Sequence, residues 1–66
     1  MSEYNLTDRE KQIAVLISKG YSNKMIGEQL FLSVYTIKNQ VKNIMTKLNA
    51  SNRAHIVSLY YNVFAQ

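Results

Sequence analysis

Residues 34–49 carry the most constraining feature of this sequence, an apolar stripe at helical spacing. Ile37, Val41, Ile44 and Leu48 recur at intervals of four, three and four residues, which places them on one side of a helix. The polar and basic side chains of the segment fall on the opposite side, and they are Tyr35, Lys38, Asn39, Lys42 and Thr46. The pattern predicts an amphipathic helix with one apolar face and one basic face.

Capping and turn residues predict three further helices. Thr7 and Glu10 have capping-box spacing ahead of an apolar periodicity that stops at Gly20, and glycine suits the left-handed position just past a helix end. Ser22 or Asn23 can cap a second, short helix, and residues 49–52 supply caps for the last one. The expected helices span about residues 8–19, 23–30, 34–49 and 52–64.

The chain has 66 residues, no cysteine and no segment that alternates between apolar and polar residues over more than a few positions. A strand is therefore not expected, and no disulfide can stabilise the fold. We predict an all-α fold with a single domain, residues 1–66. A domain of this size buries only about 60% of its unfolded surface, so its stability is expected to be marginal.

The charge is distributed unevenly along the chain. Residues 1–28 carry four acidic and four basic residues, whereas residues 29–66 carry four basic residues and no acidic one, which accounts for the net charge of +4. Two lysines on a helix often form only a solvated face, but solvated faces normally mix both signs. The asymmetry favours an anionic partner, most often a nucleic acid and less often a membrane surface.

The second and third predicted helices, joined by residues 31–34, have the helix-turn-helix arrangement. A helix about 10–12 Å across fits a DNA major groove about 12 Å wide, and its first residues point at base edges. The candidates for base or groove contacts are Tyr35, Lys38, Asn39 and Lys42. Donors to phosphate oxygens at the starts of the two helices are Ser22, Asn23, Lys24, Ser33 and Thr36.

Five motifs occur in a fixed order: LTDRE at 6–10, GYSNKxI at 20–26, LxLSxxTIKN at 30–39, NIMxKL at 43–48 and NR at 52–53. In order and spacing they resemble the LuxR-type (GerE, NarL/FixJ) helix-turn-helix domain, a four-helix DNA-binding domain of bacterial transcription regulators. The resemblance covers about residues 6–57. It implies a regulator that acts as a dimer, often with a receiver or sensor domain that this chain would then lack.

The resemblance also implies roles for single residues. It makes residues 34–49 the recognition helix, with its main groove contacts at Lys38, Asn39 and Lys42. Gln40 stands where the family frequently has His, at a position associated with a phosphate contact. Glu10 and Arg53 correspond to a pair that ties the first helix to the start of the fourth, and Arg53 is also a candidate phosphate contact.

The predicted fourth helix is more apolar than one face of a small core requires. Ala14 and Gly27 are smaller than the family's usual Leu and Ala, whereas Ile56 and Tyr60 occupy positions that are often small. The bulky residues either refill the core or enlarge a dimer face, and the sequence leaves both open. The residues assigned to a dimer interface are Ile56, Leu59, Tyr60, Val63 and Phe64.

Other function classes find little support in the sequence. One histidine, His55, and no paired carboxylates at useful spacing leave no candidate catalytic residues, and neither a metal site nor a cofactor is expected. Met25 and Met45 are interpreted as core filler. No signal-peptide pattern or membrane-length apolar run is present, so a cytoplasmic location and no membrane contact are expected.

The function predicted from the sequence is specific binding of duplex DNA by a bacterial transcription regulator, as a homodimer on inverted half-sites. The alternative is a small interaction protein that binds and inhibits a partner regulator through its apolar last helix. Weak DNA binding together with tight heterodimer formation would distinguish the alternative.

Overall fold

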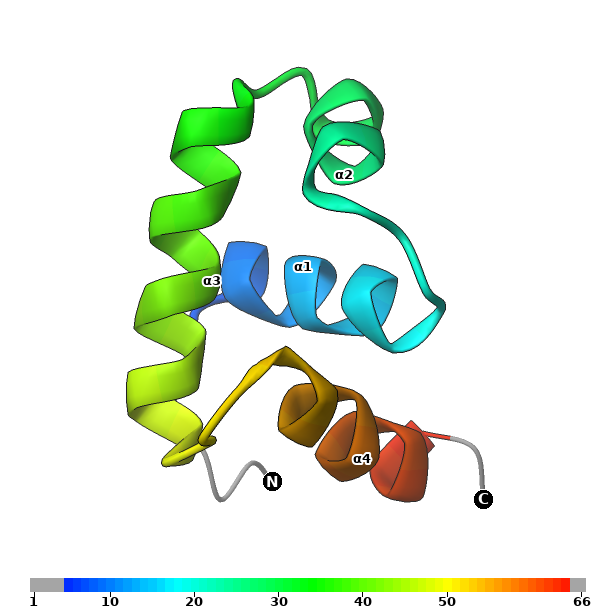
Figure 1. Ribbon diagram of the computed structural model, residues 1–66, viewed down its shortest axis with the longest axis vertical. Coiled ribbons are helices and arrows are strands. Elements are labelled where there is room, and N and C mark those ends of the chain that lie inside the picture. The colour runs from blue at the N-terminus through cyan, green and yellow to red at the C-terminus, as the bar shows by residue number, and fades with distance from the viewer. Residues whose placement is uncertain (1–4, 65–66) are drawn as a thin grey trace.

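Residues 5–64 form four α-helices and no strand in the computed structural model (Figure 1), with side chains described for residues 5–60. The helices are α1 (Asp8–Ser18), α2 (Asn23–Leu30), α3 (Val34–Leu48) and α4 (Arg53–Phe64). Their bounds differ from the predicted ones by at most one residue at either end. The prediction of an all-α fold is therefore confirmed.

Side-chain caps explain where the helices begin. The Glu10 backbone N–H donates to Oγ1 of Thr7 at 3.1 Å, and the Thr7 backbone N–H donates to Oε1 of Glu10 at 2.9 Å, which completes the predicted capping box. Ser22 and Ser33 cap α2 and α3 by accepting from the N–H three residues later. Asn52 accepts in the same way at the start of α4, at 2.9 Å.

The helix α3 runs along one side of the molecule, and α2, α1 and α4 lie beside it from one of its ends to the other (Figure 1). The central helix α1 packs against α4 and α3, and more lightly against α2. The buried apolar side chains form one core: Leu6, Ile13, Ala14, Ile17, Ile26, Ile37, Val41, Ile44, Leu48, Ile56 and Tyr60. Because the core lies on one side of α3 only, its other side faces solvent.

The bulky residues of α4 belong to this core. Ile56 is 0% exposed and Tyr60 is 4% exposed, and α4 packs chiefly on α1, where Ala14 is also fully buried. The structure thus favours core refilling over an enlarged dimer face, and it removes Ile56 and Tyr60 from the side chains that a partner can reach. Leu59 is half-buried, and the predicted interface residues Val63 and Phe64 lie outside the described side chains.

Gly20 and Gly27 have different structural roles. Gly20 follows α1 with a φ of +92°, the left-handed conformation predicted for this position. Gly27 lies inside α2 and is buried, and a Cβ atom there would lie 2.6 Å from the carbonyl oxygen of Leu32 and 3.7 Å from Cγ1 of Ile37. The missing side chain therefore lets the turn before α3 approach α2 closely.

Only one side of α2 contributes to the core. Ile26 is fully buried, but Met25 is 46% exposed, so the interpretation of Met25 as core filler is wrong. Met45 of α3 is half-buried and packs against the core. The first turn of α2 is therefore open to solvent close to its N-terminus.

Candidate nucleic-acid interface

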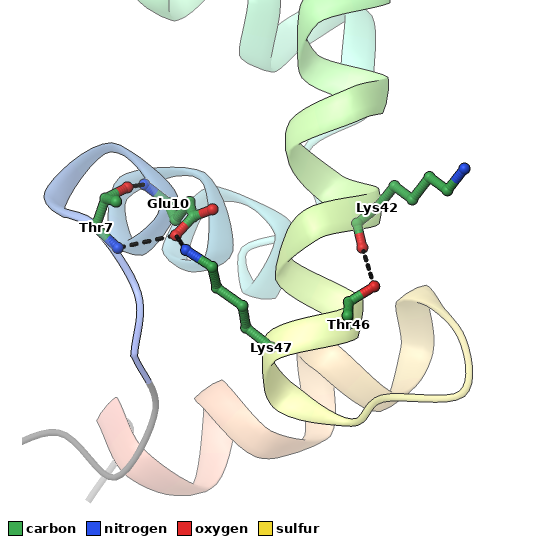
Figure 2. A network of polar contacts seen from close by, with 5 residues as sticks. All are labelled: Thr7, Glu10, Lys42, Thr46 and Lys47. Carbon is green, nitrogen blue, oxygen red and sulfur yellow. Dashed lines mark hydrogen bonds and ion pairs between the residues drawn. The ribbon is translucent and has the colours of Figure 1, made fainter.

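The helix α3 separates its side chains as the sequence predicts. Ile37 and Ile44 are fully buried, and Val41 and Leu48 are buried beside them. The four candidate groove contacts, Tyr35, Lys38, Asn39 and Lys42, are all exposed, and Tyr35 is 74% exposed. Lys42 extends away from α1, on the opposite side of α3 from Lys47 (Figure 2). One face of α3 therefore presents two ammonium groups, an amide and a phenol to solvent.

The first turn of α3 adds hydroxyl groups next to this face. The Ser33 hydroxyl accepts from the Thr36 backbone N–H at 3.0 Å and donates to Oγ1 of Thr36 at 2.9 Å. This arrangement leaves the Thr36 hydroxyl proton available for another acceptor, because a hydroxyl has one donor and two acceptor sites. Ser33 is exposed, and Thr36 and Gln40 are half-buried. The position suits contact with a phosphate oxygen.

The start of α2 holds the other candidate phosphate contacts. Ser22 and Lys24 are exposed and Asn23 is half-buried. The Asn23 side chain accepts a hydrogen bond from Nη1 of Arg53 at 2.5 Å, and Nη2 of Arg53 donates to the carbonyl oxygen of Tyr21 at 2.6 Å. The first residue of α4 is thereby joined to the first residue of α2. Arg53 is half-buried, and burial lowers the pKa of its guanidinium from the usual value.

The pair predicted between Glu10 and Arg53 is wrong. Glu10 instead receives Nζ of Lys47, from the last turn of α3, at 2.8 Å (Figure 2). Glu10 is only 4% exposed. Burial raises the pKa of its carboxyl, but the hydrogen bonds from Lys47 and from the Thr7 backbone, together with the charge of Lys47, outweigh burial and hold the pKa below its usual value. The ion pair ties α3 to α1.

These contacts distinguish the cations that are already paired within the domain. Lys47, although exposed, pairs with Glu10, and Arg53 donates to neutral oxygens, whereas Lys24, Lys38 and Lys42 are exposed and make no ion pair with another residue among 5–60. No acidic residue occurs from position 29 onward, so nothing on α3 or α4 opposes the positive charge of the exposed face. The arrangement can attract a polyanion and donate hydrogen bonds to it.

Comparison with known proteins decides the family. Residues 4–60 match the model of the luxR family of bacterial regulatory proteins, GerE. The chain belongs to this family. The luxR-family domain is similar to the transcriptional regulatory protein DegU of Brevibacillus brevis, with 48% identity over 52 residues, 79% of this chain and 22% of that protein. The family resemblance stated from the motifs is therefore confirmed.

Two further relatives have the same extent of similarity. The transcriptional regulatory protein LiaR of Bacillus subtilis is 47% identical over 49 residues, which cover 74% of this chain and 23% of LiaR. The oxygen regulatory protein NreC of Staphylococcus epidermidis is 48% identical over 52 residues, which cover 79% of this chain and 24% of NreC. The chain thus spans about a quarter of the length of the relatives it matches. The luxR family consists of regulators with a DNA-binding helix-turn-helix domain and is not a class of enzymes.

The structure of this luxR-family domain exposes apolar residues that the sequence analysis did not include in the interface. Phe31 is 92% exposed and has a φ of +59°, and Val34 is 48% exposed. Phe31 lies in the turn before α3, and Val34 is the first residue of α3. The sequence analysis placed Phe31 and Val34 in the link between the second and third helices, but the sequence carried no signal for the direction of their side chains.

Other surfaces of the luxR-family domain lie outside the interface. A shallow hollow of about 470 Å³ between α1 and α2 is lined by both apolar and polar residues and by none of the candidate contacts; the lining residues are Asp8, Lys11, Gln12, Val15, Leu16, Gln29 and Leu30. Among residues 5–60, no three His, Cys, Asp or Glu side chains gather as a metal site requires. No helix in the described part of the chain is both long and apolar enough to cross a membrane.

Proposed function

We propose that this domain regulates transcription by sequence-specific binding of duplex DNA, with α3 in the major groove. The observation that carries the proposal is the division of α3 into a buried apolar side and an exposed side with Tyr35, Lys38, Asn39 and Lys42. Lysine can donate to O6 and N7 of guanine, and asparagine can pair with N6 and N7 of adenine. Because its partner would be chromosomal DNA, the site of action is the bacterial cytoplasm.

Contacts to the phosphate backbone would set the position of α3 in the groove. Ser33 and Thr36 offer hydroxyl groups on one side, and Ser22, Asn23 and Lys24 offer donors at the start of α2. Such contacts fix the register of a protein on DNA without reading the sequence. Gln40 and Arg53 are further candidates for this set, and Arg53 is bonded to Asn23.

We propose further that the regulator binds as a homodimer on inverted half-sites. The names of the relatives, transcriptional and response regulators, support a regulatory role, and a two-fold dimer places half-sites about one helical turn of DNA apart. The buried Ile56 and Tyr60 are not available for the dimer contact. The remaining candidates on α4 are Leu59, Val63 and Phe64.

Selection from a random pool of DNA duplexes at about 0.1 M salt tests the proposal, because phosphate contacts make affinity steeply dependent on salt. We expect enrichment of an inverted repeat. Lys42→Ala should then weaken binding about 5- to 150-fold and relax base preference at one position, as expected for loss of a base contact. Lys19→Ala, an equal change of charge at the exposed end of α1, serves as the control.

The outcomes separate the alternatives. Equal loss of affinity on every sequence after Lys42→Ala would make Lys42 a phosphate contact. Unchanged affinity of the Lys42→Ala protein would contradict the assignment of α3 as the recognition helix. No binding even at low salt would contradict the proposed function, and tight binding to a partner regulator would then support an inhibitory interaction protein.

A further inference from the structure

Arg53 connects two helix starts that are 30 residues apart in the sequence. Its guanidinium donates from Nη1 to Oδ1 of Asn23 at 2.5 Å and from Nη2 to the carbonyl oxygen of Tyr21 at 2.6 Å. Both bonds are partly buried, and they meet at the turn that leads into α2. The two terminal nitrogens of the guanidinium therefore hold a backbone oxygen and a side-chain oxygen at the same time. A lysine has one terminal nitrogen and lacks this fork.

This contact determines the orientation of the Asn23 amide. An asparagine amide has an oxygen that only accepts and an NH₂ group that only donates, and a guanidinium only donates. Asn23 must therefore turn its oxygen toward Arg53, and Nδ2 with its two protons points away from the guanidinium. A neighbouring positive charge also strengthens the N–H groups as donors, because hydrogen bonds polarise one another in a chain.

The start of α2, where Asn23 lies, suits an anionic oxygen. Asn23 is the first residue of α2, where backbone N–H groups have no acceptor one turn earlier and the helix dipole favours negative charge. The exposed Lys24 follows directly, and the Ser22 hydroxyl accepts from the Met25 N–H at 3.2 Å and keeps its own proton. Arg53 itself is half-buried and bonded to Asn23.

We propose that Arg53 is a positioning residue for DNA binding: it fixes the Asn23 amide with Nδ2 outward, so that Asn23 donates to a phosphate oxygen at the start of α2. The inference rests on the proposed function, since the phosphate belongs to the bound duplex. It differs from the two simpler roles of Arg53, a direct phosphate contact and a purely structural link between α2 and α4. Each of the three roles gives a different result in a double-mutant cycle.

The cycle combines Arg53→Lys with Asn23→Ala and measures affinity for the selected duplex. Arg53→Lys keeps the charge but loses the fork, so the amide is no longer fixed. We expect Arg53→Lys to weaken binding about 3- to 10-fold, the size of one net hydrogen bond, and to have no further effect in the Asn23→Ala background. The matched control pairs Arg53→Lys with Asn39→Ala, because Asn39 lies on α3 without this partner, and there the two losses should multiply.

Salt titration distinguishes a direct contact. If Arg53 bound a phosphate itself, Arg53→Gln would make the negative slope of log affinity against log salt shallower by about 0.9 in both the wild-type and the Asn23→Ala backgrounds. We expect little change of slope in the Asn23→Ala background. Arg53→Gln removes the charge and is too short to make the Nη1 bond to Asn23, so it also replaces Arg53→Lys in the cycle if that variant does not fold.

A measurement on the free protein provides a second test. The side-chain amide NMR signals of Asn23 should shift in Arg53→Lys while those of Asn39 stay in place, and duplex DNA should move the Asn23 signals only when Arg53 is present. Losses that multiply for Arg53→Lys and Asn23→Ala, or a salt dependence that Arg53→Gln weakens further in the Asn23→Ala background, would overturn the positioning role. If the wild-type protein and its Asn39→Ala variant show no salt-dependent DNA binding, the proposed function fails as well.

Discussion

The two ends of α3 are held in different ways. At the C-terminal end, Leu48 is buried, the Lys47 ammonium reaches Glu10 of α1 at 2.8 Å, and the last turn closes with Asn49 at a φ of +55°. Ahead of the N-terminal end, Phe31, the residue that ends α2, is 92% exposed at a φ of +59°, and Tyr35 in the first turn of α3 is 74% exposed. The C-terminal end is thus anchored to the core and to α1, whereas the N-terminal end and the turn before it are exposed to solvent. We refer to them as the anchored end and the presented end.

This difference suits a recognition helix. The N-terminal residues of such a helix contact base edges, so that end must be free of covering side chains. The C-terminal end can then be fixed to the rest of the domain, which keeps the direction of the helix constant when it enters the groove. In this chain the fixed end uses an ion pair and a left-handed cap, whereas the presented end depends on the close approach of Gly27 to the turn.

The largest effect is expected from breaking the anchored end. Lys47→Met leaves the Glu10 carboxylate buried without its cation, and the free energy of unfolding should fall by about 2–3 kcal/mol, below the full cost of a broken buried pair because Lys47 is partly exposed. Urea denaturation measures the change. Lys42→Met, with the same change of charge on the exposed side of α3, should stay within about 0.5 kcal/mol of the wild type.

Affinity for DNA should respond in the reverse order. Lys42→Met should weaken binding strongly and Lys47→Met only weakly, when both proteins are measured well below their unfolding midpoints. If Lys47→Met were as stable as the wild type, the ion pair would contribute nothing net, and the anchored end would depend on Leu48 and the Asn49 cap alone.

Acid should also lower the free energy of unfolding through the Glu10–Lys47 pair at the anchored end. The loss should be smaller than that of Lys47→Met, because a protonated Glu10 carboxyl still accepts the Thr7 N–H. The folded-state pKa of Glu10 lies below its unfolded value, so this stabilisation is present above about pH 4.3 and is lost as the pH falls through the folded pKa. Unfolding midpoints measured from pH 7 to pH 2 should therefore fall more steeply for the wild type than for Glu10→Gln. Parallel curves for the two proteins would show that Glu10 does not couple to folding.

The sequence could predict the local parts of this comparison but not the pairing across helices. Helix bounds, caps and the buried stripe of α3 follow from residues close together in the chain. The bounds were predicted to within one residue, and the four predicted stripe residues of α3 are buried. Glu10 was assigned to Arg53 on the family resemblance, although Lys47 is also a cation in the second half of the chain. Which of them reaches Glu10 depends on how α3 and α4 lie on α1, and this is a property of the packed core.

The sequence also left open the location of bulky side chains. Ile56 and Tyr60 could fill a core or a dimer face, because the space beside the small Ala14 exists only after α1 and α4 have packed. The exposure of Phe31 was missed for a related reason. An apolar residue in a turn is expected to fold inward, but the left-handed backbone of Phe31 directs its side chain into solvent.

At the presented end, Gly27→Ala tests the close approach of the turn. The new Cβ would lie 2.6 Å from the Leu32 carbonyl oxygen, so the backbone of the turn must move. Alanine gains helix propensity, but crowding of backbone atoms costs more, and we expect a net loss of about 1 kcal/mol in unfolding free energy. DNA affinity should fall as well, because the turn positions the first residues of α3. A more stable variant with unchanged affinity would show that the turn can move away from α2 without loss of stability or of DNA binding.

The smallest effect is expected from making the presented end resemble the anchored one. Phe31 and Asn49 share a left-handed backbone, which asparagine tolerates and a bulky aromatic residue does not. Phe31→Asn should therefore raise the unfolding free energy by about 0.5 kcal/mol, and Asn49→Phe should lower it by about the same amount. Paired thermal and urea denaturation can resolve changes of this size when both variants are compared with the wild type.

Phe31→Asn also separates backbone strain at this residue from contact of its ring with DNA. Phe31 touches little of its own chain, so Phe31→Asn loses almost no packing, and any stability it gains must come from the backbone. If Phe31→Asn instead weakens DNA binding while it stabilises the free protein, the exposed ring is used in the complex, and the strain at the presented end is retained for that contact. If affinity is unchanged, the presented end needs only its polar side chains, and the left-handed phenylalanine has no part in recognition.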